Sequence, residues 1–532
     1  MRKLNPQQQQ AVDSTSSKIL CLAGAGAGKT ATMIERISKL VKEGVSPLSI
    51  LVLTFTNAAA FEMKDRYKRN NPGQASPEFR TFHSFCYSLI IKDKEVRKAL
   101  GYTSVPNVAD EGAIKRIESE AKLQCNIKLS EAKLSGNAPL TAQEEFEVEV
   151  YKKAVKRLIR QKNIITFDIL CYDVGGLFIA NHESIIKYKE QYTYLFVDEF
   201  QDTDPKQISF LNSFDPKTTN FYFCGDCLQN IYQFRNCSNE TIKLLAKDDS
   251  WEQIKLFENY RSTNQICKFA NNMSKYADEK YRIEMNGQRD GDKVDVIYGA
   301  HSSWNKLIDD DHLYELLDRV QRMEEDGAIL CRSNREVEYV CNALDDHGIP
   351  YVTGKRNDDA VHILKSVTDN EYMLDWLATF LSAEQYSDYI RLAAQEENPD
   401  IKWFANVYGK IKKINERGKK IVAIRGILKR NIANISKCAD ILKELEISDI
   451  LVGGVTEYTD NLIDLIIDAI ECAKSGELYV GTIHSSKGLE YGTVFVMGVD
   501  DKSFDLSKGE EMLNLYYVAI TRAKNHLVVF RV

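Results

Sequence analysis

Apolar residues recur along the chain in short runs that are separated by longer segments with helical spacing. Such runs lie at residues 17–22, 50–55, 194–197 and 220–224, and each leads into Gly, Asp or Thr-Asn. Short apolar runs with this kind of ending predict buried strands, and the segments between them predict helices. Strands that alternate with helices imply a parallel sheet, in which ligands bind at the carboxyl ends of the strands.

The same alternation returns at residues 327–354, 478–499 and 525–532, whereas residues 92–161 and 355–477 have helical spacing. A chain of 532 residues also exceeds the roughly 250 to 300 residues at which single cores stop growing. We therefore expect an α/β protein with two parallel-sheet domains, each with a helical insertion. The expected parts are 1–90 and 163–245 for the first domain, 91–162 for its insertion, 246–354 and 478–532 for the second domain, and 355–477 for a reduced second insertion.

Composition limits the class of protein. Hydrophobic residues make up 44% of the chain and charged residues 28%, which is typical of globular proteins rather than disordered ones. The net charge of −7 does not exclude a nucleic-acid partner, because such binding needs only a local basic and aromatic groove. The 12 cysteines are scattered, which indicates a reducing compartment, and no apolar run reaches the roughly 18 residues of a membrane span. We expect a cytoplasmic protein that has no membrane partner.

The strongest chemical pattern is a small-residue loop after the first strand-like run. Residues 19–30 read ILCLAGAGAGKT and lead into a helical segment. Such a loop lets backbone N–H groups curl around phosphate oxygens, while Lys29 reaches the β- and γ-phosphates and the Thr30 hydroxyl binds Mg²⁺. The alternative is a glycine-rich turn with a solvated lysine, which the flanking strand and helix disfavour. The predicted nucleotide-binding residues here are Ala23, Gly24, Ala25, Gly26, Ala27, Gly28, Lys29 and Thr30, with Ala23 in place of the usual first glycine.

An acidic pair supplies the partner that a phosphate-binding loop needs. Asp198 and Glu199 directly follow an apolar run in TYLFVDEFQD. Asp198 is placed to hold Mg²⁺ together with Thr30, and Glu199 to orient and deprotonate an attacking water. Two carboxylates at the end of a strand can also form a solvated turn, but their occurrence together with the loop favours catalysis.

Further blocks appear in one order along both expected domains. They are LNPQQQQAV, TFTNAAAFEM, TFHSF, VDEFQD, GDCLQNIYQFR, NYRS, TIHSSKGLEY and YYVAITRAK. In this order the blocks resemble the UvrD/Rep/PcrA group of superfamily 1 helicases. The resemblance implies two RecA-like motor domains and an ATP-dependent DNA helicase or translocase that moves 3′ to 5′. It also implies ATP and Mg²⁺ as cofactors, and single-stranded and tailed duplex DNA as partners.

The resemblance also implies roles at the nucleotide. Gln8 would read the adenine, Tyr260 would stack on it, and Glu490 would contact the ribose. Arg36 is a further expected nucleotide contact. Gln201 and Gln229 would couple the phosphate state to motion, while Arg261 and Arg522 would reach the γ-phosphate from the second domain. The expected catalytic set is Lys29, Asp198, Glu199, Gln229, Arg261 and Arg522.

Expected DNA contacts come from four of these blocks, and aromatic residues among them would stack on bases. They are Thr56, Asn57, Phe82, His83, Tyr232, Phe234, Arg235 and His484. Ala58 departs from the family pattern, which has a lysine there. Taken alone, each aromatic residue is more often part of a core than a base platform.

Two alternatives stay open. Ala58 and the short 355–477 segment suggest a DNA-stimulated ATPase that regulates a partner nuclease without strong unwinding of its own. A chain that ends soon after Arg522 resembles helicase subunits of anti-phage systems, such as the Gabija type, or small phage-encoded helicases. A degenerate scaffold is the other alternative, and the complete set of phosphoryl-transfer residues disfavours it.

Overall fold

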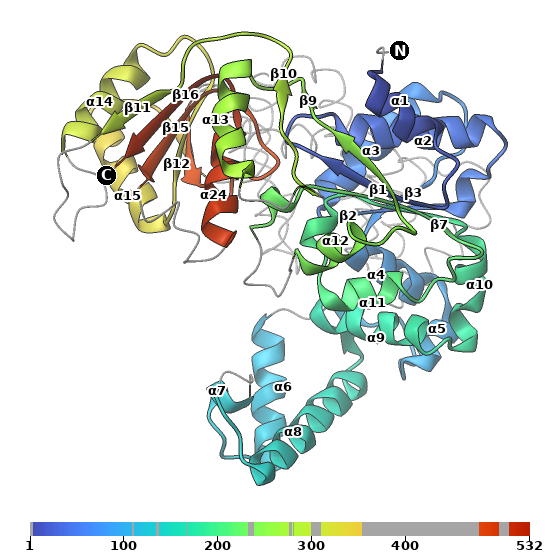
Figure 1. Cartoon of the computed structure of the whole chain (residues 1–532). Coiled ribbons are helices and arrows are strands. Elements are labelled where there is room, and N and C mark those ends of the chain that lie inside the picture. The colour runs from blue at the N-terminus through green and yellow to red at the C-terminus, as the bar shows by residue number, and fades with distance from the viewer. Residues whose placement is uncertain are drawn as a thin grey trace, which may run out of the picture.

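The computed structural model describes residues 4–108, 111–134, 138–165, 167–231, 239–275, 279, 281–298, 310–353, 478–499 and 510–531. Two parallel sheets of six strands each organise this part of the chain, and Figure 1 shows them side by side. The predicted α/β class with two parallel-sheet domains is confirmed. The expected insertion at 355–477 lies outside the described residues.

The first sheet has the strand order β3-β2-β6-β7-β1-β8, and every pairing is parallel. The four apolar runs predicted in this half of the chain are all strands of the sheet. Its strands are β1 (Lys18–Ala23), β2 (Ile50–Thr54), β3 (Glu78–Thr81), β6 (Tyr194–Val197), β7 (Asn220–Gly225) and β8 (Glu252–Leu256).

Helices cover both faces of this sheet, which explains why its strands are apolar throughout. In β1, Ile19 and Cys21 face one apolar cluster, whereas Leu20 and Leu22 face the other. The first cluster includes residues of α1 (Pro6–Asp13), α2 (Lys29–Lys42) and α3 (Asn57–Asn70). The second includes residues of α4 (Phe82–Lys92), α5 (Lys94–Ala99), α9 (Phe167–Ile179), α10 (Glu183–Gln191), α11 (Pro205–Leu211) and α12 (Glu240–Leu245). Short 3-10 turns are η1 (Pro47–Ser49), η2 (Phe200–Asp202) and η3 (Cys227–Gln229).

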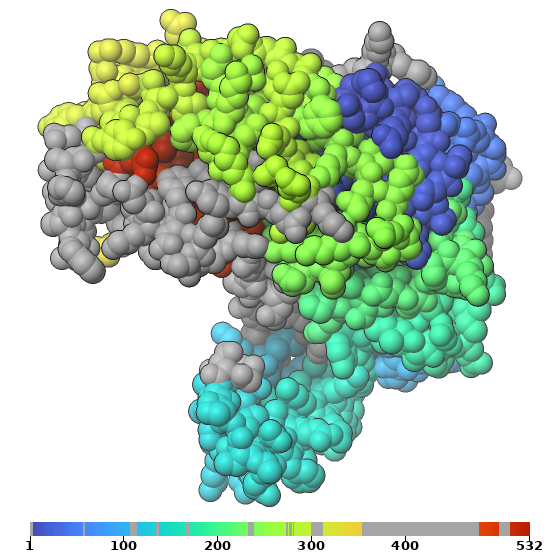
Figure 2. Space-filling model, viewed as in Figure 1, coloured from blue at the N-terminus to red at the C-terminus, as the bar shows by residue number. Residues whose placement is uncertain are grey.

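A helical arm projects from the first domain (Figures 1 and 2) and has an apolar cluster of its own. It contains α6 (Glu111–Gln124), α7 (Glu131–Leu134) and α8 (Ala142–Gln161), with the short strands β4 (Asn107–Val108) and β5 (Ile164–Ile165) at its base. The predicted start of this insertion at residue 91 is wrong. Val96, Leu100 and Tyr102 are buried in the cluster of the first domain, so the chain leaves that domain only after them.

The second sheet has the order β11-β16-β15-β12-β14-β13, again with parallel pairings. Its strands are β11 (Asp295–Tyr298), β12 (Gly327–Cys331), β13 (Val352–Thr353), β14 (Leu478–Thr482), β15 (Tyr491–Val499) and β16 (Ala523–Arg531). One face packs on α14 (Asp310–Gln321) and α15 (Asn334–Asp346), and the other on α13 (Asn264–Ser274) and α24 (Glu510–Ile520). The pair β9 (Glu258–Asn259) and β10 (Asn286–Gly287) lies between the sheets (Figure 1).

The predicted boundary between the domains at residues 245 and 246 is wrong as well. β8 pairs in parallel with β1 and closes the edge of the first sheet, so the first domain extends to Leu256. The two domains are in contact through an apolar cluster that continues from the first sheet through α13 and α24 to the second sheet. Among the described helices, none combines the length and apolar character that crossing a membrane requires.

Candidate functional site

The small-residue loop lies at the carboxyl end of β1, where it turns into α2. Gly26 and Gly28 have φ angles of 66° and 77°, in the left-handed region that favours glycine. Lys29 is the first residue of α2 and Thr30 is the second. The N-terminus of α2 thus opens onto the loop, where its first N–H groups and the helix dipole favour an anion.

A segment from much later in the chain packs directly on this loop. The Asn259 side chain, 1% exposed, donates to the Ala25 carbonyl at 2.8 Å, and the Tyr260 N–H donates to the Gly26 carbonyl at 3.0 Å. A Cβ atom at Gly26 would lie 2.7 Å from the Cβ of Arg261. The absence of a side chain at Gly26 therefore allows the arginine segment to approach the loop.

The start of the chain forms another wall of the loop. Asn5 caps α1 by accepting a hydrogen bond from the Gln8 N–H at 2.8 Å, and the Gln8 side chain donates to the Ala27 carbonyl at 3.0 Å. Asn5 also donates to the Tyr260 hydroxyl at 2.9 Å. Gln8 thus lies next to Gly28, and Asn5 connects it to Tyr260, which is the arrangement expected of residues that hold a base. Their contact with adenine stays a prediction.

Arg36 does not have the predicted role at the nucleotide. Its guanidinium is buried and donates to the carbonyls of Ala11 at 2.9 Å and Ser14 at 2.9 Å, at the end of α1. It also lies over the ring of Tyr222. Carbonyls at the end of a helix have no intrahelical partner, so a cation there satisfies them and interacts favourably with the helix dipole.

We expect Arg36→Met to lower the free energy of unfolding by about 1 to 3 kcal/mol, because the substitution removes hydrogen bonds from a charged donor to buried carbonyls. Urea unfolding of this variant, with the exposed Arg322→Met as the control, measures the effect. If Arg36→Met kept the stability of the unsubstituted protein and lost ATP affinity instead, the role predicted from the sequence would be right.

The acidic pair follows β6 and faces the lysine of the loop. Glu199 has a φ angle of 50°, and its Oε2 lies 3.3 Å from the Nζ of Lys29. Burial, followed by the Glu199 charge, raises the pKa of Asp198 to about 7. Burial also acts to raise the pKa of Glu199, but the charges of Lys29 and Lys487 outweigh it and lower this pKa to about 2. Glu199 is therefore held ionised beside Lys29.

Asp198 has the surroundings of a ligand for a hard cation. The residue is 7% exposed, and its buried Oδ1 has no hydrogen-bond partner within the described part of the chain. Burial of such an oxygen is unfavourable unless a cation or a water binds it. No group of three or more His, Cys, Asp or Glu side chains among the described residues could hold a metal ion. A single buried carboxylate of this kind, with the Thr30 hydroxyl, would fit Mg²⁺, which binds proteins through one or two carboxylates plus substrate phosphates.

Two glutamines link the acidic pair to the second domain. Gln201 donates to Glu199 at 2.6 Å and accepts from the Asp226 N–H at 3.0 Å. Gln229 donates to the Asp226 carboxylate at 2.8 Å and accepts from Arg522 at 3.4 Å. A continuous hydrogen-bonded path thus leads from Glu199 to a guanidinium of the second domain.

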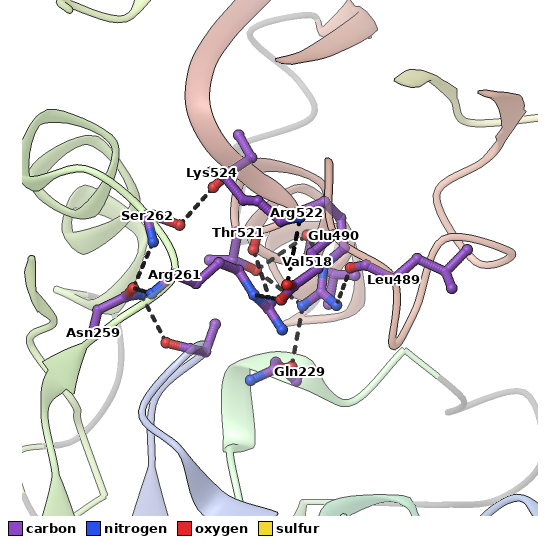
Figure 3. Close-up of polar contacts among 12 residues, drawn as sticks. Gln229, Asn259, Arg261, Ser262, Leu489, Glu490, Val518, Thr521, Arg522 and Lys524 are labelled. Carbon is purple, nitrogen blue, oxygen red and sulfur yellow. Dashed lines mark hydrogen bonds and ion pairs between the residues drawn. The ribbon is translucent and has the colours of Figure 1, made fainter. Parts of the chain in front are cut away.

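The two predicted arginines come together at this boundary (Figure 3). Arg261 donates to Glu490 at 2.6 Å and to the Thr521 carbonyl at 3.1 Å. Glu490 also forms an ion pair with Lys524, whose Nζ lies 3.6 Å from Glu490 Oε1. The structure therefore shows Glu490 bound to cations of its own domain, and its contact with a ribose stays a prediction.

Arg522 is a buried cation whose partners are neutral. It is 2% exposed, and its hydrogen bonds go to the carbonyls of Val518 and Leu489 and to the side chains of Gln229 and Thr521. Burial, followed by the nearby charge of Arg261, lowers the pKa of Arg522 to about 9. Two guanidinium groups that repel one another next to the small-residue loop favour the binding of an anion between them.

The structure contradicts one of the expected DNA contacts, and several others lie outside the described residues. Phe82 is 6% exposed and packs edge-on against Phe210, so the prediction that it offers a stacking surface to bases is wrong. Thr56 caps α3 by accepting from the Ala59 N–H at 3.1 Å. Asn57 begins α3, but its side chain is outside the described part. Tyr232, Phe234 and Arg235 also lie outside the described residues.

The other two expected DNA contacts lie near the acidic pair and at the boundary between the domains. His83 lines a cavity of about 150 Å³ that Asp198 and Glu199 also line, together with Phe55. His484 is partly buried in the turn after β14, close to the backbone of Ile231 in the first domain. Their contact with DNA stays a prediction.

Several residues at the boundary were not singled out from the sequence. Lys487 donates to the carboxylate of Asp202, Tyr517 donates to that of Asp226 at 3.4 Å, and Asn514 donates to the Asn230 carbonyl at 2.9 Å. All of them lie within or beside the quoted blocks. A polar residue on a mostly apolar helix or next to a strand end is the sequence pattern that could have identified these residues.

Comparisons with known proteins agree with this geometry. The family model for the UvrD/REP helicase N-terminal domain matches residues 4–250, and the model for the UvrD-like helicase C-terminal domain matches residues 254–358 and 398–531. The ATP-dependent DNA helicase PcrA of Bacillus subtilis is 28% identical over 98% of this chain and 82% of its own length. The ATP-dependent DNA helicase Rep of Buchnera aphidicola is 27% identical over 98% of this chain and 94% of its own length.

The two family matches cover both sheet domains and meet at residues 250 to 254, next to the strand that closes the first sheet. They also contain the loop, the acidic pair and both arginines that the structure brings together. The chain belongs to the UvrD/REP helicase family.

Proposed function

We propose that this protein is an ATP-dependent DNA helicase or translocase that moves 3′ to 5′ on single-stranded DNA and uses Mg²⁺. The observation that carries the proposal is the buried guanidinium of Arg522. It lies beside Arg261 with neutral partners, and Gln229 connects it to the acidic pair. A triphosphate bound by the loop would supply the missing anion, and its binding would draw the two domains together. Relatives that are named ATP-dependent DNA helicases support this choice, and the polarity rests on the family resemblance.

Each residue then has a chemical task in hydrolysis. Lys29 and the N–H groups at the start of α2 hold the phosphates. Glu199, kept ionised by Lys29, orients the attacking water and accepts its proton. Thr30 and Asp198 would hold Mg²⁺, which neutralises charge on the phosphate oxygens when bound. Arg261 and Arg522 stabilise the charge of the transition state from the second domain.

Loss of the γ-phosphate removes the group that both domains bind. The guanidinium groups then again repel one another, and the boundary opens. The path from Glu199 through Gln201, Asp226 and Gln229 to Arg522 couples this opening to the acidic pair. Opening and closing of two domains on a DNA strand is the physical basis of translocation.

The test combines ATP hydrolysis with strand displacement. We expect single-stranded DNA to stimulate ATP hydrolysis, and the protein to unwind a duplex with a 3′ tail in preference to one with a 5′ tail. Lys29→Ala should lose both activities, because the γ-phosphate loses the lysine that reaches it. The exposed Lys98→Ala serves as the control. No DNA stimulation, or full activity of Lys29→Ala, would rule out the proposal.

The same assay separates the alternative of an ATPase that regulates a partner nuclease. That alternative requires DNA-stimulated hydrolysis without unwinding by the protein alone. Within the described residues, no observation favours a nuclease-binding surface. Strand displacement by the purified chain would therefore exclude the alternative.

A further inference from the structure

Two cysteines lie close together where α4 packs on α9. Cys86 on α4 is 3% exposed and belongs to the apolar cluster of the first domain, and Cys171 on α9 packs against this cluster from a half-buried position. The two helices are in contact, since the ring centroids of Phe85 and Phe178 lie 6.3 Å apart. Cys171 precedes Phe178 by seven residues, or two helical turns, so both side chains lie on one face of α9. That face brings the Cys171 thiol next to the thiol of Cys86.

An imidazole completes this cluster of side chains. His83 lies one helical turn before Cys86 on α4, and its ring is close to the Cys171 thiol. The Cys86 thiol, together with His83, lowers the pKa of Cys171 to about 6, against the effects of burial and of the Asp204 carboxylate. Cys171 and burial in turn raise the pKa of Cys86 well above its usual value. One thiol of the pair is therefore a nucleophile near neutral pH, while the other stays protonated.

Neither thiol has a task in the proposed hydrolysis. Within the described ranges, no three His, Cys, Asp or Glu side chains are grouped in a way that could hold a metal ion, so the cluster is not a metal centre. Both cysteines are free thiols in the structure. A half-exposed thiolate beside a second, buried thiol is the arrangement of redox-sensitive pairs, in which one sulfur reacts with an oxidant and the other resolves the product.

We propose that Cys171 and Cys86 form a redox-sensitive pair, which a peroxide converts into a disulfide between α9 and α4. The Cys171 thiolate attacks one oxygen of hydrogen peroxide, and the O–O bond breaks. The departing hydroxide takes up the proton that Cys171 had released, which leaves a sulfenic acid on Cys171 and one water. Cys86 then attacks this sulfur, and its proton leaves with the sulfenic oxygen as a second water. A dithiol reductant reverses the bond by exchange, so in a reducing compartment the bond is transient.

The disulfide would join the chain on both sides of the helical arm. Residues 87–170, between the two cysteines, include α6, α7 and α8, so the bond closes the base of this arm. A crosslink across a long loop restricts the unfolded chain and thereby stabilises the folded state. The inference goes beyond the proposed function, because it concerns thiols that neither bind the nucleotide nor activate water.

The first experiment treats the full, unsubstituted chain with hydrogen peroxide and maps its disulfides by mass spectrometry of peptides. We expect a peptide pair linked through Cys86 and Cys171, which dithiothreitol separates. In Cys86→Ala, Cys171 should instead accumulate as a sulfenic acid that dimedone traps. The matched control is Cys125→Ala, which replaces a half-buried cysteine directly after α6 and should form the bond like the unsubstituted chain.

The second experiment measures the nucleophile without any oxidant, through the rate at which iodoacetamide modifies each cysteine. At pH 7, Cys171 should react about 10-fold or more faster than Cys125, because the thiolate is the reacting form. The rate at Cys171 should fall as the pH drops below about 6, where the thiolate takes up a proton. Cys86 should react more slowly than Cys171 at every pH, since it is buried and protonated.

A peroxide-treated chain in which Cys86 and Cys171 remain unlinked would overturn the inference. So would a bond from Cys171 to a different cysteine, or a Cys171 that iodoacetamide modifies no faster than Cys125. The mapping uses the unsubstituted chain, so a variant that fails to fold leaves its result intact. ATP hydrolysis enters neither measurement, and failure of this inference is thus distinct from failure of the proposed function.

Discussion

Arg522→Ala is expected to lower kcat for ATP hydrolysis by about 10³-fold or more, which is the range that arginine fingers contribute. Arg522 is 2% exposed and its partners are neutral, so the group is held ready for a phosphate rather than neutralised by a carboxylate. Its contribution arises as charge develops on the transferred phosphoryl group. Nucleotide affinity should therefore fall much less than the rate. Single-turnover hydrolysis with saturating ATP and oligo(dT) measures the change.

The control for this variant is Arg322→Ala, which removes an exposed arginine that pairs with Asp318 on α14. It should hydrolyse ATP like the unsubstituted protein. Arg522 also donates to Val518 and Leu489, so a thermal melt must show that Arg522→Ala is folded. A folded Arg522→Ala variant with an undiminished rate would contradict the role of this arginine.

Glu199→Gln is expected to lower kcat by about 10²- to 10⁴-fold, the usual contribution of a positioned general base. The substitution preserves size and can still accept the hydrogen bond from Gln201, but it removes the charge that receives the proton. It also frees Lys29 from its ion pair, so ATP should bind at least as tightly as before. The measurement is a rapid-quench burst experiment combined with equilibrium binding of a fluorescent ATP analogue.

A matched control is Glu95→Gln, since Glu95 lies on the exposed face of α5 and pairs only with a surface lysine in the described part of the chain. Equal losses in ATP binding and in kcat for Glu199→Gln would point to a structural role for Glu199. Hydrolysis at an undiminished rate would show that another group activates the water.

Local patterns predicted the parts of the site that depend on short stretches of chain. The loop at Gly26 and Gly28 and the acidic pair after β6 are each fixed by a strand, a turn and a helix that are contiguous in sequence. Apolar runs predicted both parallel sheets because strands covered on two faces must be apolar throughout. These features can be recognised from their local sequence alone, because none of them depends on a distant residue.

Features that depend on distant pairings could not be predicted in this way. β8 joins the first sheet only because β1 has a free edge, and its sequence alternates like that of many edge strands. Arg36 looks like a cation next to a phosphate loop, yet the carbonyls at the end of α1 bind it. Phe82 shares its block with His83, but Phe210, from a distant helix, covers its ring.

The ion pair of Lys487 and Asp202 is another feature that depends on a distant pairing and could not be predicted from local patterns. Each residue lies within a block that carries the family resemblance, but the sequence of neither block indicates that Lys487 and Asp202 form a pair. Their pairing follows from the way the turn after β14 docks on the turn after β6. Charged residues buried between domains are therefore identified by the fold and not by local spacing.

A crystal structure with ADP, Mg²⁺ and aluminium fluoride, which together mimic the transferred phosphoryl group, would show directly whether both domains bind the nucleotide. We expect Lys29, Arg261 and Arg522 all to donate hydrogen bonds to the fluoride ligands, with Arg261 released from Glu490. We also expect Glu199 to lie within hydrogen-bonding distance of the water opposite the leaving oxygen. If the nucleotide were bound and closed between the domains while either guanidinium pointed away from it, the proposed role of the two arginines at the γ-phosphate would be contradicted.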